Sequence, residues 1–221
     1  ERILAGTTQL AFVAGANALA SLRRSRKLHA HLDWDHGGDG EPIWMGGTRL
    51  GSSEAETAYG LAVPTDCYPV VENALRVRRG RSLQEHQQKL GALMAPFTRV
   101  AARNPYAWFP TERSAAELIT PGAGNRMISY PYPKYLNAVL ITDQAAGVLM
   151  CDVQTARRLG VPEDRWVYWH GGADTSERAW HVSERPEIGA SPALAECARR
   201  TFVNAFAKPG ATARDIDHFD F

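Results

Sequence analysis

One apolar run lies near the N-terminus of the chain and a second lies in its second half. Each run is followed by an amphipathic segment, and a long stretch that predicts helix separates the two. The runs LAFVAG (10–15) and NAVLITDQAAGVLMC (137–151) predict buried strands. The segments ANALASLRR (16–24) and DVQTARRLGV (152–161) predict the helices that follow them, the second ending at Gly160. Strands followed directly by helices are typical of α/β proteins.

Further elements are predicted toward the two ends of the chain. Residues 1–6 predict the last turns of a helix, and 165–173 (RWVYWHGGA) predict a strand closed by two glycines. Residues 191–210 predict an amphipathic helix, with Ser191 as its N-cap and Gly210 beyond its end. DIDHFDF (215–221) predicts the start of another strand. The element order is βα, a helical insertion, and then βαβαβ.

The middle of the chain predicts mostly helix after a glycine-rich loop at 29–52. Helices are expected after Ser52 or Ser53, over 70–80, after Ser82, and over 111–120 with Thr111 as cap; the prolines of PTDCYP (64–69) are expected to break the chain. In the long segment after Ser82, Pro96 should bend or divide the helix. Its apolar positions recur at helical spacing and predict one buried face, formed by Leu83, Leu90, Leu93, Met94, Phe97 and Val100. The sequence therefore predicts three regions, which are 1–28, the inserted region 29–128, and 129–221.

Composition places the chain among globular proteins of one large or two small domains. Of its 221 residues, 44% are hydrophobic and 22% are charged, and no run of about 20 apolar residues occurs. A net charge of +1 gives no global indication of a nucleic-acid or membrane partner. Three scattered cysteines without a CxxC pair favour a reducing, cytoplasmic location. The chain begins at Glu1 and ends on DIDHFDF, so we expect a part of a longer protein.

Two basic clusters allow either a solvated face or a site for phosphate, and the sequence leaves both open. They are Arg23, Arg24, Arg26 and Lys27, and Arg76, Arg78, Arg79 and Arg81. HAHLDWDH (29–36) has no zinc-site spacing and is expected to be solvated loop. Cys67 has no assignable base, and His170 is expected at the end of a strand in a structural role. No dinucleotide or P-loop motif is present.

Several segments in the right order together resemble the thiolase superfamily. They are VAGANALASLRR (13–24), the long segment VRRGRSLQ to ELIT (77–120), DQAAGVLM (143–150), and RPEIGASP to DIDHFDF (185–221). The chain is most similar to sterol-carrier-protein-type thiolases and to bacterial acetyl-CoA acetyltransferase-like proteins. The resemblance implies a layered αβαβα fold, incomplete here, with 29–128 as the inserted, mostly helical loop domain.

The resemblance also implies a ligand and an assembly. Acyl-CoA would be the substrate, no cofactor would be bound covalently, and the protein would be a homodimer or homotetramer. The loop domain would return to the sheet beside the acyl-CoA channel, which makes Tyr132, Lys134, Tyr135 and Asn137 the candidate ligand contacts. Asp143 would start the strand–helix packing as a polar cap, and would not be a catalytic acid.

The family's catalytic cysteines and histidine would lie upstream and downstream of these residues, so we expect no catalytic residue here. The implied function is acyltransferase chemistry in lipid metabolism, by Claisen condensation or thiolytic cleavage of a 3-ketoacyl-CoA. The alternative is a non-catalytic thiolase-like protein that binds acyl-CoA or serves as a partner subunit. A third interpretation makes 52–120 a helical protein-interaction module.

Overall fold

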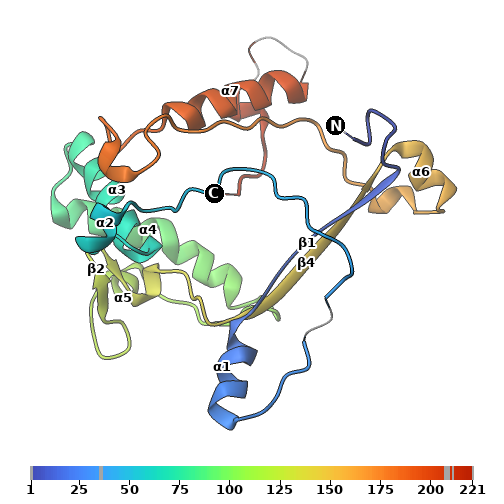
Figure 1. Ribbon diagram of the computed structural model, residues 1–221. Helices are drawn as coiled ribbons and strands as arrows, with labels where there is room; N and C mark the ends of the chain where they lie inside the picture. The colour runs from blue at the N-terminus through green and yellow to red at the C-terminus, as the bar shows by residue number, and fades with distance from the viewer. Residues whose placement is uncertain (1, 35–36, 207–209, 211, 221) are drawn as a thin grey trace. The chain divides into compact units, whose positions relative to one another are not determined.

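The computed structural model describes residues 2–34, 37–206, 210 and 212–220 (Figure 1). The chain forms two compact units, one from Glu1–Ile43 and Val139–Trp169 and the other from Trp44–Ala138 and His170–Phe221. The predicted three-region division was drawn along the sequence, and it stays a prediction.

The first unit is built on a long two-stranded ribbon. Strand β1 (Leu10–Ala18) pairs antiparallel with β4 (Asp143–Cys151), in register from Leu10 opposite Cys151 to Ala18 opposite Asp143. Helix α1 (Leu19–Leu28) follows β1 at once, and α6 (Val153–Arg158) follows β4, so both predicted strand–helix steps are confirmed. The Gly160 stop is confirmed as well, because this residue has a φ of +67°.

The expected burial of these strands is wrong. Large apolar side chains on both strands are exposed, among them Phe12, Val13, Val148 and Leu149. The physical reason is that a strand is buried only by what covers its faces, and two strands alone cover neither. Among the described residues, the sheet holds β1 and β4 and no third strand.

Asp143, the first residue of β4, holds the first turn of α1. Its carboxylate oxygens accept hydrogen bonds from the Ser21 backbone N–H at 3.0 and 3.1 Å and from the Ser21 hydroxyl at 2.7 Å. A carboxylate at the start of a helix satisfies N–H groups that have no partner within the helix. The acid in an apolar run is therefore a cap on a helix 122 residues away in sequence.

Serine N-caps begin three helices of the second unit. Helices α2 (Glu54–Ala58), α4 (Leu83–Ala101) and α5 (Ala115–Ile119) start after Ser53, Ser82 and Ser114, and each cap forms a capping box with a glutamate three residues on. The caps at Ser53 and Ser82 are as predicted. The cap predicted at Thr111 is wrong, because α5 begins at Ala115 and Ser114 forms the reciprocal hydrogen bonds with Glu117.

Prolines do not interrupt the helices as expected. Helix α3 (Pro64–Arg78) runs through PTDCYP, with Pro64 at the first helical position, where no backbone N–H is needed, and Pro69 inside the helix. Helix α4 continues through Pro96. Beyond that proline, Thr98 accepts a hydrogen bond from the Arg113 N–H at 2.9 Å, which fixes the last turns of the helix from outside.

The core of the second unit lies between α4 and α5, around Leu118, which is 1% exposed. At Gly91 the helices approach so closely that a Cβ would lie 2.6 Å from the Ala115 carbonyl oxygen. The predicted buried face of α4 is wrong: Leu93 is 62% exposed, and Phe97 and Val100 are exposed as well. Helix α5 packs where a glycine permits close approach, and the larger apolar side chains lie on another side.

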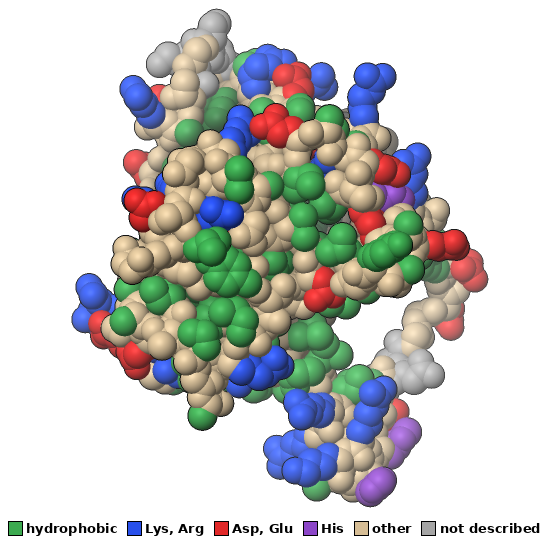
Figure 2. All heavy atoms as spheres, turned by 90° about the vertical axis from the view of Figure 1, so that its left-hand side faces the viewer, with side chains coloured by type: hydrophobic (Ala, Val, Ile, Leu, Met, Phe, Trp, Pro, Cys, Tyr) green, Lys and Arg blue, Asp and Glu red, His purple; other side chains and the backbone are tan. Residues whose placement is uncertain are grey.

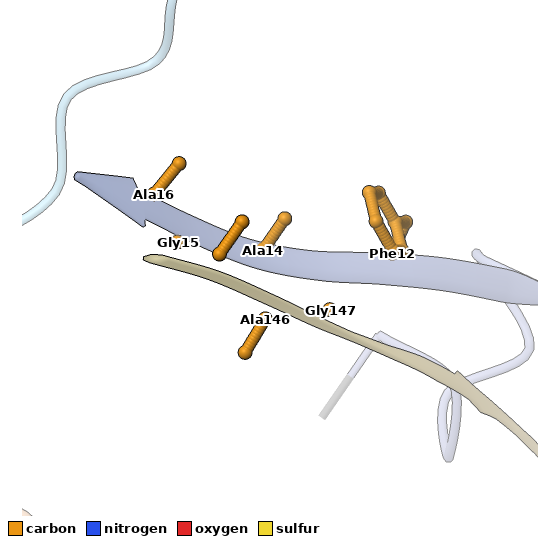
Figure 3. Close-up of a pocket in the computed structure, with 7 residues that line it drawn as sticks. Phe12, Ala14, Gly15, Ala16, Ala146 and Gly147 are labelled. Carbon is orange, nitrogen blue, oxygen red and sulfur yellow. The ribbon is translucent and has the colours of Figure 1, made fainter. Parts of the chain in front are cut away.

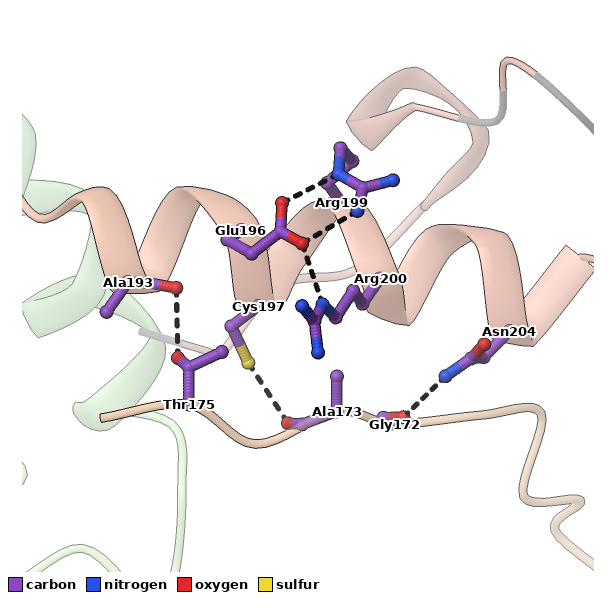
Figure 4. Close-up of polar contacts among 9 residues, drawn as sticks. All are labelled: Gly172, Ala173, Thr175, Ala193, Glu196, Cys197, Arg199, Arg200 and Asn204. Atoms are coloured by element: carbon purple, nitrogen blue, oxygen red, sulfur yellow. Dashed lines mark hydrogen bonds and ion pairs between the residues drawn. The ribbon is translucent and has the colours of Figure 1, made fainter. Parts of the chain in front are cut away.

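Helix α7 (Pro192–Phe206) packs on the extended segment before it (Figure 4). The Ser191 hydroxyl accepts from the Leu194 N–H at 3.0 Å, which confirms the predicted cap. The predicted strand at 165–173 is wrong, because its carbonyls bond to side chains: Asn204 donates to Gly172 at 3.1 Å and Cys197 to Ala173 at 3.0 Å.

The remaining elements are short. They are strands β2 (Met127–Ser129) and β3 (Tyr132–Pro133) and the 3-10 turns Lys134–Leu136, Glu163–Arg165, Val182–Glu184 and Ala213–Asp215. Described residues 2–6 form turns instead of the expected helix, and 216–220 form no strand. Residues 30–34 and 37–53 are loop, as predicted. No described helix combines the length and the apolar character that crossing a membrane requires.

Candidate functional site

The four candidate ligand contacts lie on one short segment of the second unit. Tyr132 belongs to β3, Lys134 and Tyr135 to the following 3-10 turn, and Asn137 comes just after it. Strand β3 pairs antiparallel with β2. The Asn125 side chain holds this segment, because its oxygen accepts a hydrogen bond from the Tyr135 N–H at 2.9 Å.

Tyr132 forms the first link of a buried polar network that joins three elements. Its hydroxyl donates to Oε2 of Glu72 on α3, and Oε1 of the same carboxylate lies 2.7 Å from Nε2 of His86 on α4. Burial, and then the hydrogen bond to Glu72, raise the pKa of the Tyr132 phenol above its ordinary value. The phenol is therefore a protonated donor at neutral pH.

The network also fixes which ring nitrogen of His86 carries the proton. His86 is 2% exposed, and a carboxylate can only accept, so the shared proton lies on Nε2. The other ring nitrogen, Nδ1, is buried with no hydrogen-bond partner among the described residues. A neutral ring leaves only a lone pair there, which costs less than a buried N–H without an acceptor. The network therefore holds α3, α4 and β3 together.

The other candidates differ in how free their side chains are. The Asn137 amide donates to the Pro133 carbonyl oxygen at 2.9 Å, and the Arg113 guanidinium carbon lies 3.8 Å from the centre of the Tyr135 ring. Lys134 is exposed, and only its backbone is engaged, in a bond to the Arg126 carbonyl oxygen at 2.9 Å. Of the four, Lys134 has the side chain best able to reach a ligand, and the ligand role of the segment stays a prediction.

Sequence reasoning missed Glu72 and His86. His86 stands four residues before Leu90, on the apolar face of the segment that follows Ser82, and this position was a usable signal of burial. Glu72 gave no such signal, because its partners lie 14 and 60 residues away in sequence.

The second basic cluster is partly engaged within the protein. One Arg76 N–H donates to the Arg81 carbonyl oxygen at 2.8 Å, and Arg78 forms an ion pair with Glu187 at 3.0 Å. These contacts favour a structural role for the two arginines. Among the residues described in 29–36, no cluster that could hold a metal ion occurs; Asp35 and His36 lie outside the described residues.

None of the three cysteines has a catalytic base beside it among the described residues. The Cys197 thiol donates to the Ala173 carbonyl oxygen, and Cys67 lies within α3 and Cys151 at the end of β4. His170 is exposed and, since 165–173 form no strand, it does not lie at a sheet edge.

Each unit carries an open hollow on its surface. In the first unit, a hollow of about 430 Å³ lies over small residues of the ribbon (Figure 3), where the Phe12 ring covers Gly147 and a Cβ there would be 2.7 Å away. In the second, a hollow of about 530 Å³ lies between α3 and the β2–β3 turn, lined in part by Asn73 and Tyr130. Neither contains a nucleophile with a base, so neither is an active site by itself.

Comparison with known proteins identifies the fold. No family model and no curated protein matches the sequence. Among solved structures, the chain is similar to a monomeric SCP2-thiolase-like protein type 1 from Mycobacterium smegmatis, with 34% identity and a TM-score of 0.72. The match covers 96% of this chain and 38% of the other, so the chain spans well under half the length of that relative.

The comparison confirms the expected α/β, thiolase-like fold and the resemblance to sterol-carrier-protein-type thiolases. That relative is described as monomeric, so the expectation of a dimer or tetramer gains no support from it. Since the similarity extends over nearly every residue present, the chain has a thiolase-like fold and is similar to the SCP2-thiolase-like proteins.

Proposed function

We propose that this chain is the loop domain and a part of the core of a thiolase-like protein that binds acyl-CoA and transfers its acyl group. The observation that carries the proposal is the similarity to the SCP2-thiolase-like protein over 96% of the chain. The substrate would be acyl-CoA, the reaction Claisen condensation or thiolytic cleavage, and the setting lipid metabolism.

The division of work within the protein follows from the site. A thiolate nucleophile needs a base or another group that lowers its pKa, and among the described residues none of the three cysteine thiols hydrogen-bonds to a histidine or a carboxylate. The residues that form and break the acyl thioester would therefore lie outside these 221 residues. This chain would supply ligand contacts, with Lys134 as the first candidate for the CoA phosphates.

The test uses the natural gene product, incubated with acetyl-CoA and mapped by mass spectrometry. We expect a stable acyl group on a cysteine other than Cys67, Cys151 and Cys197. An adduct on one of these three would overturn the division of work. Binding of CoA without any adduct would favour the alternative, a non-catalytic acyl-CoA-binding or partner subunit. Absence of CoA binding in calorimetry would refute the proposal.

Lys134 gives a residue-level test with a matched control. Lys134→Ala should weaken CoA binding several-fold, because an ammonium group beside a phosphate is a charge-assisted contact. Lys89→Ala removes an equally exposed charge from α4 and should leave binding unchanged. Equal effects of the two substitutions would show that only the overall charge matters.

A further inference from the structure

The solvent side of α1 carries four cations that have no partner. Arg23, Arg24, Arg26 and Lys27, here called the α1 basic face, are all exposed. Among the described residues, none of them makes a side-chain hydrogen bond, an ion pair or a ring contact. No Asp or Glu occurs in the sequence from Arg2 to Leu32, so nothing on α1 itself reduces this charge.

Some arginines outside α1 form ion pairs with carboxylates. Ion pairs join Arg78 to Glu187, Arg99 to Glu112, Arg157 to Glu163 and Arg199 to Glu196, at 2.7 to 3.3 Å. Figure 4 shows Glu196 between Arg199 and its neighbour Arg200. The α1 basic face differs from these paired positions, because its four cations lie within residues 23–27 of a helix that carries no carboxylate.

The helix presents this charge outward on a convex surface. Ser25 is buried, and the helical repeat places the four cations on the opposite side of α1 from it. Asp143 holds the first turn of the helix to β4, which leaves this side free. Figure 2 shows Lys and Arg side chains gathered over α1. The two surface hollows described above are lined by other residues.

Exposed apolar side chains flank the basic face. Leu28, the last residue of α1, is 62% exposed, and Trp34 in the following loop is 50% exposed. A basic helix with a few exposed apolar and aromatic neighbours is suited to the interface of an anionic bilayer. A nucleic acid would use the same cations but would gain less from the leucine.

We propose that the α1 basic face docks the protein on a membrane surface rich in anionic lipid, through contacts of its four cations with headgroup phosphates. The net charge of +1 gave no such expectation, because an excess of acidic residues in the rest of the chain offsets the four cations of this helix. The proposal is independent of acyl transfer, since it uses no residue of the predicted ligand segment.

The test is flotation of the natural protein with vesicles of phosphatidylcholine alone or with about a third phosphatidylglycerol. Each cation near an anionic surface adds about fivefold to the partition coefficient. The variant R23Q/R24Q/R26Q/K27Q should therefore lose about two to three orders of magnitude in binding to anionic vesicles. The variant R78Q/R99Q/R157Q/R199Q loses the same charge from paired positions and should retain its binding.

Two further conditions keep the result interpretable. R23K/R24K/R26K retains the charge and should retain binding, and circular dichroism verifies that every variant is folded. Raising the salt from about 0.1 to 1 M shortens the screening length from about 10 to 3 Å and should release the protein. Equal binding to neutral vesicles, or equal loss in the two quadruple variants, would overturn the proposal.

Other sources of phosphate are separate arms of the same experiment. Inorganic phosphate or free CoA that displaced the protein at constant ionic strength would show a small-anion site and overturn the membrane assignment. Duplex DNA bound more tightly than the anionic vesicles, with the same dependence on the four cations, would overturn it in favour of nucleic acid.

Discussion

Leu118 should contribute more to the unfolding free energy of the second unit than any of the exposed apolar side chains of α4. Truncating one side chain of each kind measures the difference. Leu118→Ala removes a side chain that is 1% exposed, and such truncations cost about 2–5 kcal/mol in unfolding free energy. We expect the upper half of this range, because the cavity cannot collapse. Gly91 already brings α4 against the Ala115 carbonyl, and Asn125 Nδ2 holds the carbonyl of Leu118 itself at 3.2 Å.

Leu93→Ala is the matched control, because it deletes the same atoms from a side chain that is 62% exposed. It should change the unfolding free energy by no more than about 0.5 kcal/mol. Urea denaturation followed by circular dichroism and tryptophan fluorescence measures both variants, and each 1 kcal/mol also lowers the melting temperature by about 2–4 °C in a chain of this size. A cost for Leu93→Ala as large as that for Leu118→Ala would refute the reasoning, since it would place the stripe in a core.

Three other substitutions test close packing, the polar network and the helix cap. Gly91→Ala gains about 1 kcal/mol of helix propensity but forces a Cβ against a carbonyl oxygen 2.6 Å away, so we expect the unfolding free energy to fall by about 1–2 kcal/mol. Gly122→Ala, with open space around it, is the control and should leave the unfolding free energy unchanged in the same denaturation assay. Because the pKa of Tyr132 is raised, ultraviolet titration should show one of the seven tyrosines ionising at a higher pH than the others. Tyr132→Phe should abolish that step and leave a carboxylate oxygen of Glu72 without its donor, and an unchanged titration curve would contradict the network. Hydrogen bonds from the first turn of α1 hold the pKa of Asp143 below its ordinary value, so the carboxylate stabilises the fold at pH values above that ordinary pKa and ceases to do so as the pH falls through its pKa in the folded protein. Asp143→Asn should therefore be less stable than the natural protein near neutral pH and converge with it in acid. A difference in stability that stays constant at all pH values would argue against the cap.

Local signals in the sequence were reliable where one turn of chain decides the outcome. Ser53 and Ser82 cap helices because their partners, Glu56 and Glu85, stand three residues away. Gly160 ends a helix through its own backbone conformation. The strand–helix steps at both ends of the ribbon are local in the same sense, because strand and helix follow each other without a gap.

The failures concern what each element packs against. The apolar runs of β1 and β4 predicted buried strands, and the structure leaves both faces of the ribbon exposed. The apolar stripe of α4 predicted the core face, but the helix packs through Gly91. The predicted strand at 165–173 is instead an extended segment whose carbonyls bond to side chains of α7.

The candidate segment shows the same limit. Tyr132, Lys134, Tyr135 and Asn137 were found together because they are neighbours in the chain. The structure adds that Tyr132 and Asn137 use their polar groups within the protein, which leaves Lys134 as the freest of the four. Glu72 and His86 could not be assigned to this segment from sequence, since they come from two other helices.

The sequence by itself determined the thiolase-like resemblance, the two strand–helix steps and the caps at Ser53, Ser82 and Ser191, because each step and each cap depends on residues that are near one another in the chain. The polar cap expected at Asp143 is confirmed, but only the tertiary structure decided that it acts on Ser21 of α1, that Glu72 joins Tyr132 to His86, and that four cations of α1 have no partner among the described residues. Contacts of this kind depend on which segments meet in space, and no periodicity along one segment records the position of another.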